Sequence, residues 1–143
     1  TGMALYLNGS ASPFLKKAMN TLEEISSKFE KSPLGAQVSM VLAKNLSNPF
    51  YRIKKDKMVK ERDANPGDAL KFTEKSLNYQ KAESSAFQNI DYHELRKIRT
   101  ELLVNMGKTE EAKKEVKELV NELKKRGVNQ PVLDDIKSYT KGL

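Results

Sequence analysis

Apolar residues recur at steps of three and four along most of the 143-residue chain, and this spacing constrains its fold more than any other feature. Residues so spaced share one face of an α-helix, whereas a half-buried strand needs alternation with period two, which no segment sustains. The clearest stretch lies between Thr109 and Gly127. Its apolar face consists of Ala112, Val116, Leu119, Val120 and Leu123. The pattern therefore predicts an all-α fold.

Proline, asparagine and glycine divide this pattern into about six helices. A capping residue followed by proline is typical of a helix start, because the cap satisfies free N–H groups and proline needs no hydrogen bond in the first turn. Glycine is typical of a helix end, because it adopts the left-handed conformation without strain. The starts are Ser12-Pro13, Ser32-Pro33, Asn65-Pro66, the capping box Asp91-x-x-Glu94, Thr109 and Pro131, and the stops are Asn48-Pro49, Gly107 and Gly127.

The resulting helices are expected to pair. The connection EKSP, residues 30–33, is short enough to force its two helices to run antiparallel. Their apolar stripes extend from Leu15 to Phe29 and from Leu34 to Leu46. The predicted helices are 13–29, a second from Pro33 to the Asn48-Pro49 break, a third from Pro66, then 92–106, 109–126 and a short last helix from Pro131.

The composition excludes several kinds of chemistry. The chain has no cysteine, which removes disulfides, thiolate metal sites and cysteine nucleophiles. Its one histidine, His93, has no second histidine or cysteine one turn away, and we interpret it as a partly exposed residue of the capping turn. No phosphate-cradling, nucleophile or zinc motif occurs. We therefore predict no catalytic, cofactor-binding or metal-binding residues.

Location is left open by the sequence. No apolar run approaches the roughly 20 residues that a membrane-spanning helix needs. The first ten residues, TGMALYLNGS, lack the basic start and cleavage pattern of a signal peptide. The abrupt start leads us to expect a fragment of a longer protein.

One pattern of small and larger residues recurs three times. An alanine is followed by residues four and seven positions later, as expected where two helices cross closely beside a filled groove. The three sets are Ala18, Leu22 and Ile25; Ala69, Thr73 and Ser76; and Ala112, Val116 and Leu119. The recurrence predicts stacked helix hairpins.

With this pattern the chain resembles the tetratricopeptide repeat family, whose 34-residue helix pairs stack into a superhelix. The segment LLVNMGKTEEAKKEVKELVNEL, residues 102–123, carries the likeness, with Gly107 as the glycine between helices and Ala112 as the alanine of the second helix. LEEISSKFEKSPLGAQVSMVLAKNL, residues 22–46, is similar to repeat junctions in bacterial envelope proteins of this superfamily. The alanines, however, lie 51 and 43 residues apart, and Arg96, Arg99 and Thr100 stand where the family has its early Trp-Leu-Gly positions.

The resemblance implies one domain over residues 1–143, a right-handed superhelix of antiparallel hairpins that acts as a scaffold for a protein or peptide. It carries over no catalytic residue, and it makes the cell envelope a possible location. Tyrosines are candidate contacts, since they offer rigid area with a polar tip, although packing between hairpins is the alternative for each. They are Tyr6, Tyr51, Tyr79, Tyr92 and Tyr139, and we add Arg96 beside Tyr92.

A second hypothesis concerns the basic insertion between helices at residues 50–64, which we expect to be a loop with a helical turn. Residues 50–62, FYRIKKDKMVKER, hold six basic residues against two acidic ones, in a chain of net charge +7. Aromatic and basic residues together can bind single-stranded nucleic acid or an anionic surface. The alternative is a solvated insertion whose apolar residues, Phe50, Ile53, Met58 and Val59, pack on the core. The candidate contacts are Tyr51, Arg52, Lys54, Lys55, Lys57 and Lys60.

Overall fold

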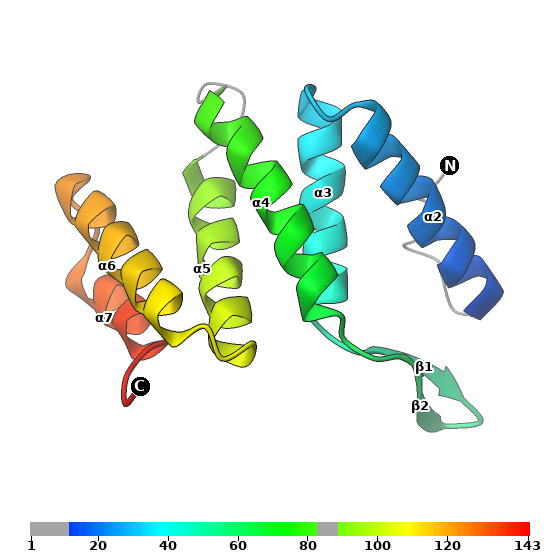
Figure 1. Ribbon diagram of the computed structural model, residues 1–143. Coiled ribbons are helices and arrows are strands. Elements are labelled where there is room, and N and C mark those ends of the chain that lie inside the picture. The colour runs from blue at the N-terminus through cyan, green and yellow to red at the C-terminus, as the bar shows by residue number, and fades with distance from the viewer. Residues whose placement is uncertain (1–11, 83–88) are drawn as a thin grey trace. The chain divides into compact units, whose positions relative to one another are not determined.

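The computed structural model describes residues 12–82 and 89–143, with side chains for 15–80 and 92–143 (Figure 1). The described residues form six α-helices and one two-stranded sheet, which confirms the predicted all-α class of about six helices. Tyr6 lies outside the described residues. The elements are α2 (Ser12–Lys28), α3 (Pro33–Leu46), β1 (Phe50–Lys54), β2 (Lys57–Arg62), α4 (Pro66–Ala82), α5 (Asn89–Asn105), α6 (Thr109–Lys125) and α7 (Gln130–Ser138).

The chain divides into two compact units, residues 1–87 and 88–143. The first holds α2, α3, the sheet and α4, and the second holds α5, α6 and α7. That the two units act as one domain stays a prediction.

In the first unit, α3 packs against both α2 and α4. The alanines of the repeated pattern, Ala18 and Ala69, are fully buried. Polar side chains also cross between the helices: the Ser26 and Ser39 hydroxyls share a hydrogen bond of 2.7 Å. The Ser76 hydroxyl of α4 donates to the carbonyl of Ala36 in α3 at 3.0 Å. These contacts fix the register of the three helices.

The connection between α2 and α3 corrects the predicted stripes. Phe29 and Leu34 are 43% and 48% exposed rather than buried. Here Gly35 takes the inward position, and a Cβ at this residue would lie 2.0 Å from the carbonyl oxygen of Phe29. The backbone at the end of α2 therefore lies directly against Gly35, and the side chains of Phe29 and Leu34 point toward solvent.

Two of the predicted caps are confirmed. Ser32 Oγ accepts from the backbone N–H of Gly35 at 3.3 Å, and Asn65 Oδ1 accepts from that of Asp68 at 3.1 Å. Such bonds satisfy N–H groups that have no partner within the first turn.

Two other predicted starts were wrong. Lys108, not Thr109, is the capping residue of α6, because its carbonyl already accepts from the N–H of Ala112 at 3.0 Å and so closes the first turn. Helix α5 begins at Asn89, so Asp91 lies inside its first turn rather than at the position that precedes it.

In the second unit, α6 packs against α5 on one side and α7 on the other. Gly107 and Gly127 end α5 and α6 with φ angles of 75° and 74°, as predicted for left-handed stops. The predicted face of α6 is buried along its whole length. The core between α6 and α7 consists of Val116, Leu119, Val120, Leu123, Leu133 and Ile136.

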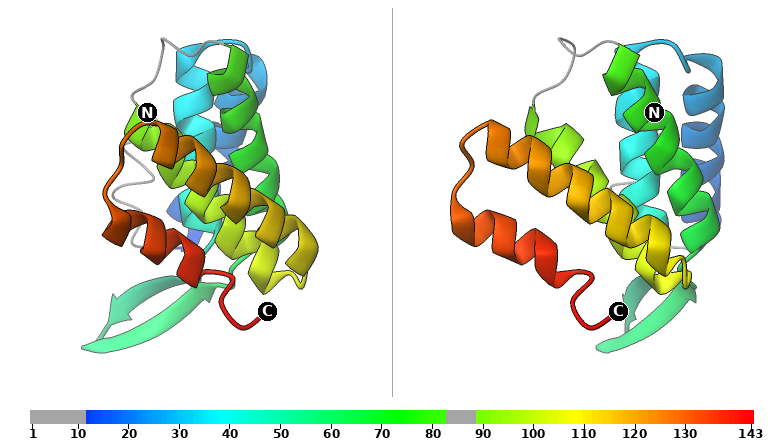
Figure 2. Two further views of the ribbon diagram at one scale, coloured as in Figure 1. Left: turned by 90° about the vertical axis from the view of Figure 1, so that its left-hand side faces the viewer. Right: turned by 60° about the vertical axis from the view of Figure 1, so that its left-hand side comes forward.

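Residues 50–62 form an antiparallel β-hairpin, so the expected loop with a helical turn was wrong. The hairpin extends beyond the ends of α3 and α4 (Figure 1 and Figure 2). Short alternation in which neither face is buried carries too little apolar contrast to stand out in a sequence.

Candidate binding sites

The hairpin closes through a tight turn at Lys55 and Asp56. Both residues are left-handed, with φ angles of 51° and 62°, and the pair Lys54–Lys57 flanks them. Two consecutive left-handed residues define a type I′ turn, which usually takes Asn-Gly because other side chains are strained there.

The strand pairing gives the hairpin two distinct faces. Since cross-strand partners lie on the same face, Tyr51 and Ile53 share one face with Lys60 and Met58. Ile53 and Met58 face each other across the strands and are 76% and 71% exposed. The predicted alternative, in which the apolar residues pack on the core, was therefore wrong for this pair, because the register places it near the turn and far from the helices.

The base of the hairpin is fixed to the end of α3. The Arg62 guanidinium donates to the carbonyls of Asn45 at 2.8 Å and Asn48 at 3.3 Å, and also to Asn45 Oδ1. The backbone N–H of Asn65 donates to the carbonyl of Leu46 at 2.8 Å. Carbonyls at a helix C-terminus carry partial negative charge, so a guanidinium is favoured there.

Two more of the basic side chains are neutralised within the hairpin. Arg52 forms an ion pair with Glu61, the extra residue of a bulge between the pairs Phe50–Arg62 and Tyr51–Lys60. Lys60 lies 2.6 Å from Asp63, whose hydrogen bond and charge raise the pKa of Lys60. Of the predicted contacts, these two already have partners.

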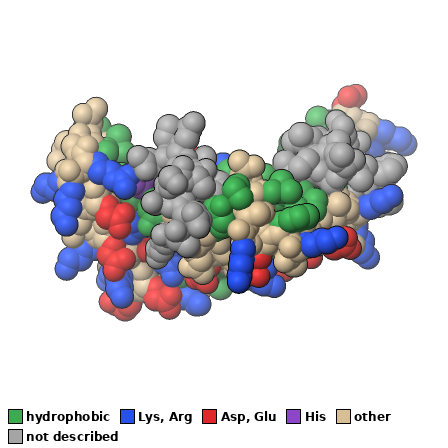
Figure 3. Space-filling view, turned by 90° about the horizontal axis from the view of Figure 1, so that it is seen from above, with side chains coloured by type: hydrophobic (Ala, Val, Ile, Leu, Met, Phe, Trp, Pro, Cys, Tyr) green, Lys and Arg blue, Asp and Glu red, His purple; other side chains and the backbone are tan. Residues whose placement is uncertain are grey.

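The remaining lysines cluster at the turn. Lys54, Lys55 and Lys57 are exposed, and none of them forms an ion pair within the part of the chain that the structure describes. The tip thus combines three cations with the exposed pair Ile53–Met58. By contrast, basic and acidic side chains are interleaved on the face shown in Figure 3.

The other predicted contacts, Tyr92 and Arg96, lie where α5 meets α6. Arg96 is only 4% exposed, and its Nε lies 2.6 Å from Glu115 Oε1. Glu122 accepts from the same guanidinium, and the Tyr92 ring lies 5.5 Å from it. Burial disfavours the charge of Arg96, but the hydrogen bonds and charges of Glu115 and Glu122 outweigh it and raise its pKa.

Glu115 also lies 3.1 Å from Arg99 Nη1, so one carboxylate bridges two guanidinium groups. We call Arg96, Arg99, Glu115 and Glu122 the α5–α6 ion-pair cluster. Arg96 and Arg99, which replace the Trp-Leu-Gly positions of the repeat family, therefore join α5 to α6. That Arg96 also contacts a partner stays a prediction, and its charge is already compensated.

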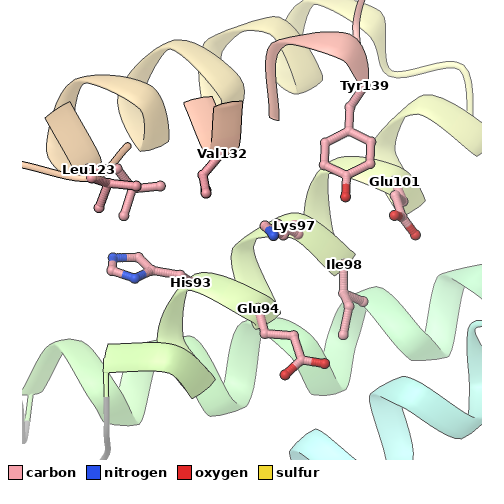
Figure 4. Close-up of a pocket in the computed structure, with 9 residues that line it drawn as sticks. His93, Glu94, Lys97, Ile98, Glu101, Leu123, Val132 and Tyr139 are labelled. Atoms are coloured by element: carbon pink, nitrogen blue, oxygen red, sulfur yellow. The ribbon is translucent and has the colours of Figure 1, made fainter. Parts of the chain in front are cut away.

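The second unit contains a groove of about 540 Å³ between α5 and α7 (Figure 4). Its floor is Leu123 of α6, and Val132 of α7 is 40% exposed beside it. Ile98 of α5 is partly buried and also lines this groove. Its lining residues are His93, Glu94, Lys97, Ile98, Glu101, Leu123, Val128, Val132 and Tyr139.

Polar groups mark the two ends of the groove. At one end, His93 Nε2 is buried and has no hydrogen-bond partner among the described residues. Burial, followed by the positive charge of Arg126, lowers the pKa of His93, so its ring is neutral at pH 7. At the other end, the hydroxyl of Tyr139 points toward Glu101 (Figure 4), and burial together with that charge raises the pKa of Tyr139.

Tyr139 was predicted as a candidate contact, but the groove was not predicted from the sequence. Its walls come from two helices that are not consecutive, and no spacing within one helix reports such a pairing. His93, which we had interpreted as a partly exposed residue of the capping turn, was the other residue of the groove that stood out in the sequence.

The described residues contain no cluster of His, Cys, Asp or Glu able to hold a metal ion. None of the helices described is long and apolar enough to cross a membrane. Comparison of the chain with protein-family models, curated proteins and solved structures yields no match. The likeness to tetratricopeptide repeats and the right-handed superhelix therefore stay predictions.

Proposed function

We propose that the chain is a non-catalytic helical module that binds a protein or peptide partner, with the α5–α7 groove as its binding site. The observation that carries this proposal is the groove itself, which joins an apolar floor and wall to polar groups at both ends. Sites for small peptides and ligands have this composition, because apolar burial supplies affinity and a few polar groups set orientation.

The lining residues suggest what a partner presents. Ile98, Leu123 and Val132 would surround an apolar side chain. The unpartnered Nε2 of His93 would exchange a hydrogen bond with a polar group beside it, since a buried polar atom without a partner is costly. The volume of about 540 Å³ suits a few residues of a partner chain. An apolar anchor within a short polar segment is thus the expected ligand.

Peptide selection tests this function. Peptides are selected from a random library on the 143-residue chain, and their affinities are measured for the wild type and for Val132→Glu. Val132 is 40% exposed, so the charge changes the groove without entering the core. We expect affinity to fall by about tenfold or more, because the glutamate would be buried beside the ligand.

Leu34→Glu is the matched control, since Leu34 is similarly exposed, at 48%, and lies in the first unit. Selected peptides should bind this variant like the wild type. Equal binding to Val132→Glu and the wild type would show that the groove is not the binding site.

A further inference from the structure

The tip of the β-hairpin, residues 53–58, combines features that neither packing nor the groove explains. Ile53 and Met58 are 76% and 71% exposed, although apolar side chains of this size are usually covered. Lys54 and Lys57 form the next cross-strand pair, on the opposite face of the hairpin, and Lys55 lies in the turn. All three are exposed, without an ion pair among the described residues. Elsewhere in the hairpin, Arg52, Lys60 and Arg62 have partners. The unpaired cations are thus concentrated where the exposed apolar pair lies.

The turn adds an independent observation. Lys55 and Asp56 occupy left-handed conformations that Asn and Gly adopt with less strain. Strained residues that persist in a fold often indicate a functional requirement. Here the fold tolerates a strained residue, Lys55, and so has a third lysine at the end of the hairpin.

We propose that this tip contacts an anionic phospholipid surface. Ile53 and Met58 would enter the boundary between headgroups and acyl chains, while Lys54, Lys55 and Lys57 would pair with lipid phosphates. Long lysine side chains can keep their ammonium groups among the headgroups while their stems lie along apolar surface. Each lysine near an anionic leaflet adds to the attraction.

The side-chain types favour lipid over nucleic acid. Binding to single strands relies on aromatic rings that stack on bases, with arginine as the preferred cation. At the tip the apolar residues are aliphatic, and the unpaired cations are lysines. The one tyrosine, Tyr51, lies two residues further from the turn than Ile53. This inference does not depend on the α5–α7 groove, which involves other residues.

Vesicle sedimentation tests the proposal with the full chain. The probes are vesicles of phosphatidylcholine alone and of equal parts phosphatidylcholine and phosphatidylglycerol. We expect salt-sensitive binding to the anionic vesicles only. Ile53→Ser with Met58→Ser should weaken it by about tenfold, and Lys54→Gln, Lys55→Gln and Lys57→Gln together by about tenfold or more.

The matched control removes three exposed lysines elsewhere in the first unit: Lys16→Gln, Lys17→Gln and Lys31→Gln. It has the same net charge as the tip variant and should bind nearly as the wild type does. Equal losses in the two lysine variants would overturn the proposal, because they would indicate a response to net charge alone. Unchanged binding of the Ile53→Ser, Met58→Ser variant would overturn it as well.

A fluorescent reporter tests insertion directly. The chain contains no tryptophan, so Ile53→Trp introduces a single indole at the tip. Its emission should shift to the blue with anionic vesicles and be quenched by brominated lipid, while Leu34→Trp should show neither change. Absence of the shift, or tighter salt-sensitive binding of Ile53→Trp to a single-stranded oligonucleotide than to the anionic vesicles, would overturn the proposal.

Discussion

The α5–α6 ion-pair cluster and the β-hairpin are both rich in charged residues, but the charges have different roles in the two regions. In the cluster, Arg96 is 4% exposed and Glu115 is 8% exposed, so each charge depends on its partner. In the hairpin, the lysines of the tip stay in solvent and have no partner among the described residues. The comparison shows that the compensation of a charge, rather than its presence in a sequence, separates a residue that holds helices together from one available for binding.

The largest expected effect is the loss of Glu115. Glu115→Ala would leave Arg96 buried with a weaker set of partners, which should lower the free energy of unfolding by about 3 kcal/mol. Urea denaturation would measure the loss. Glu118→Ala is the control, because the Glu118 side chain is 52% exposed and lies 3.9 Å from Arg96. It should cost about 0.5 kcal/mol or less. Similar costs for the two variants would contradict a structural role for the cluster.

The crossing of α5 and α6 gives the next effect. Ala112 is fully buried, so Ala112→Leu must separate the helices or strain a rotamer, at a cost of roughly 1–3 kcal/mol. Thermal melting would measure it. Lys113→Leu, at the next, more exposed position of α6, should change the melting temperature far less. Equal melting temperatures would show that Ala112 does not mark the crossing.

The hairpin should respond in the opposite direction. Lys55→Asn with Asp56→Gly relieves two strained residues and should stabilise the hairpin by roughly 1 kcal/mol. Hydrogen exchange of the hairpin amides would measure this. The same variant loses one lysine and one aspartate, so the net charge of the tip is unchanged and its binding to anionic vesicles should change little. Exchange as fast as in the wild type would contradict strain in this turn.

The smallest effect concerns His93 and pH. Its pKa is lowered in the fold from 6.5, so the unfolded chain takes up a proton at this residue before the folded chain does. The contribution of neutral His93 to stability is therefore present above pH 6.5 and is lost as pH falls below it. Denaturation at several pH values should show a shallower decline for His93→Asn than for the wild type. Parallel curves would indicate that the groove does not shield this ring.

The helices could be predicted from the sequence because each long stripe meets a matching partner. For the start of α3 and the end of α6, the predicted and observed boundaries agree closely, because the Ser32 side chain caps the first turn of α3 and Gly127 adopts a left-handed conformation. The hairpin could not be predicted in the same way. It buries neither face, and its turn uses Lys55-Asp56 in place of the usual Asn-Gly.

The candidate sites were predicted unevenly. The basic residues of the hairpin were identified from composition, but their pairing depends on contacts such as Arg62 with Asn45, 17 residues apart. The burial of Arg96 likewise depends on Glu115 and Glu122 of another helix. The groove requires α7 to lie opposite α5, which only the packing of the second unit determines.

The hydrogen bond between the N–H of Asn65 and the carbonyl of Leu46 has a consequence for how this protein can change. At 2.8 Å, it joins the two ends of the segment that carries the hairpin through backbone atoms that belong to neither strand. A short turn could therefore replace residues 50–61, provided that Arg62 stays to bind the carbonyls of Asn45 and Asn48. The hairpin could likewise be transplanted to another helix pair with the same gap. During evolution, the hairpin could be gained or lost, or the residues of its tip could be replaced, while the helices that carry it stay the same.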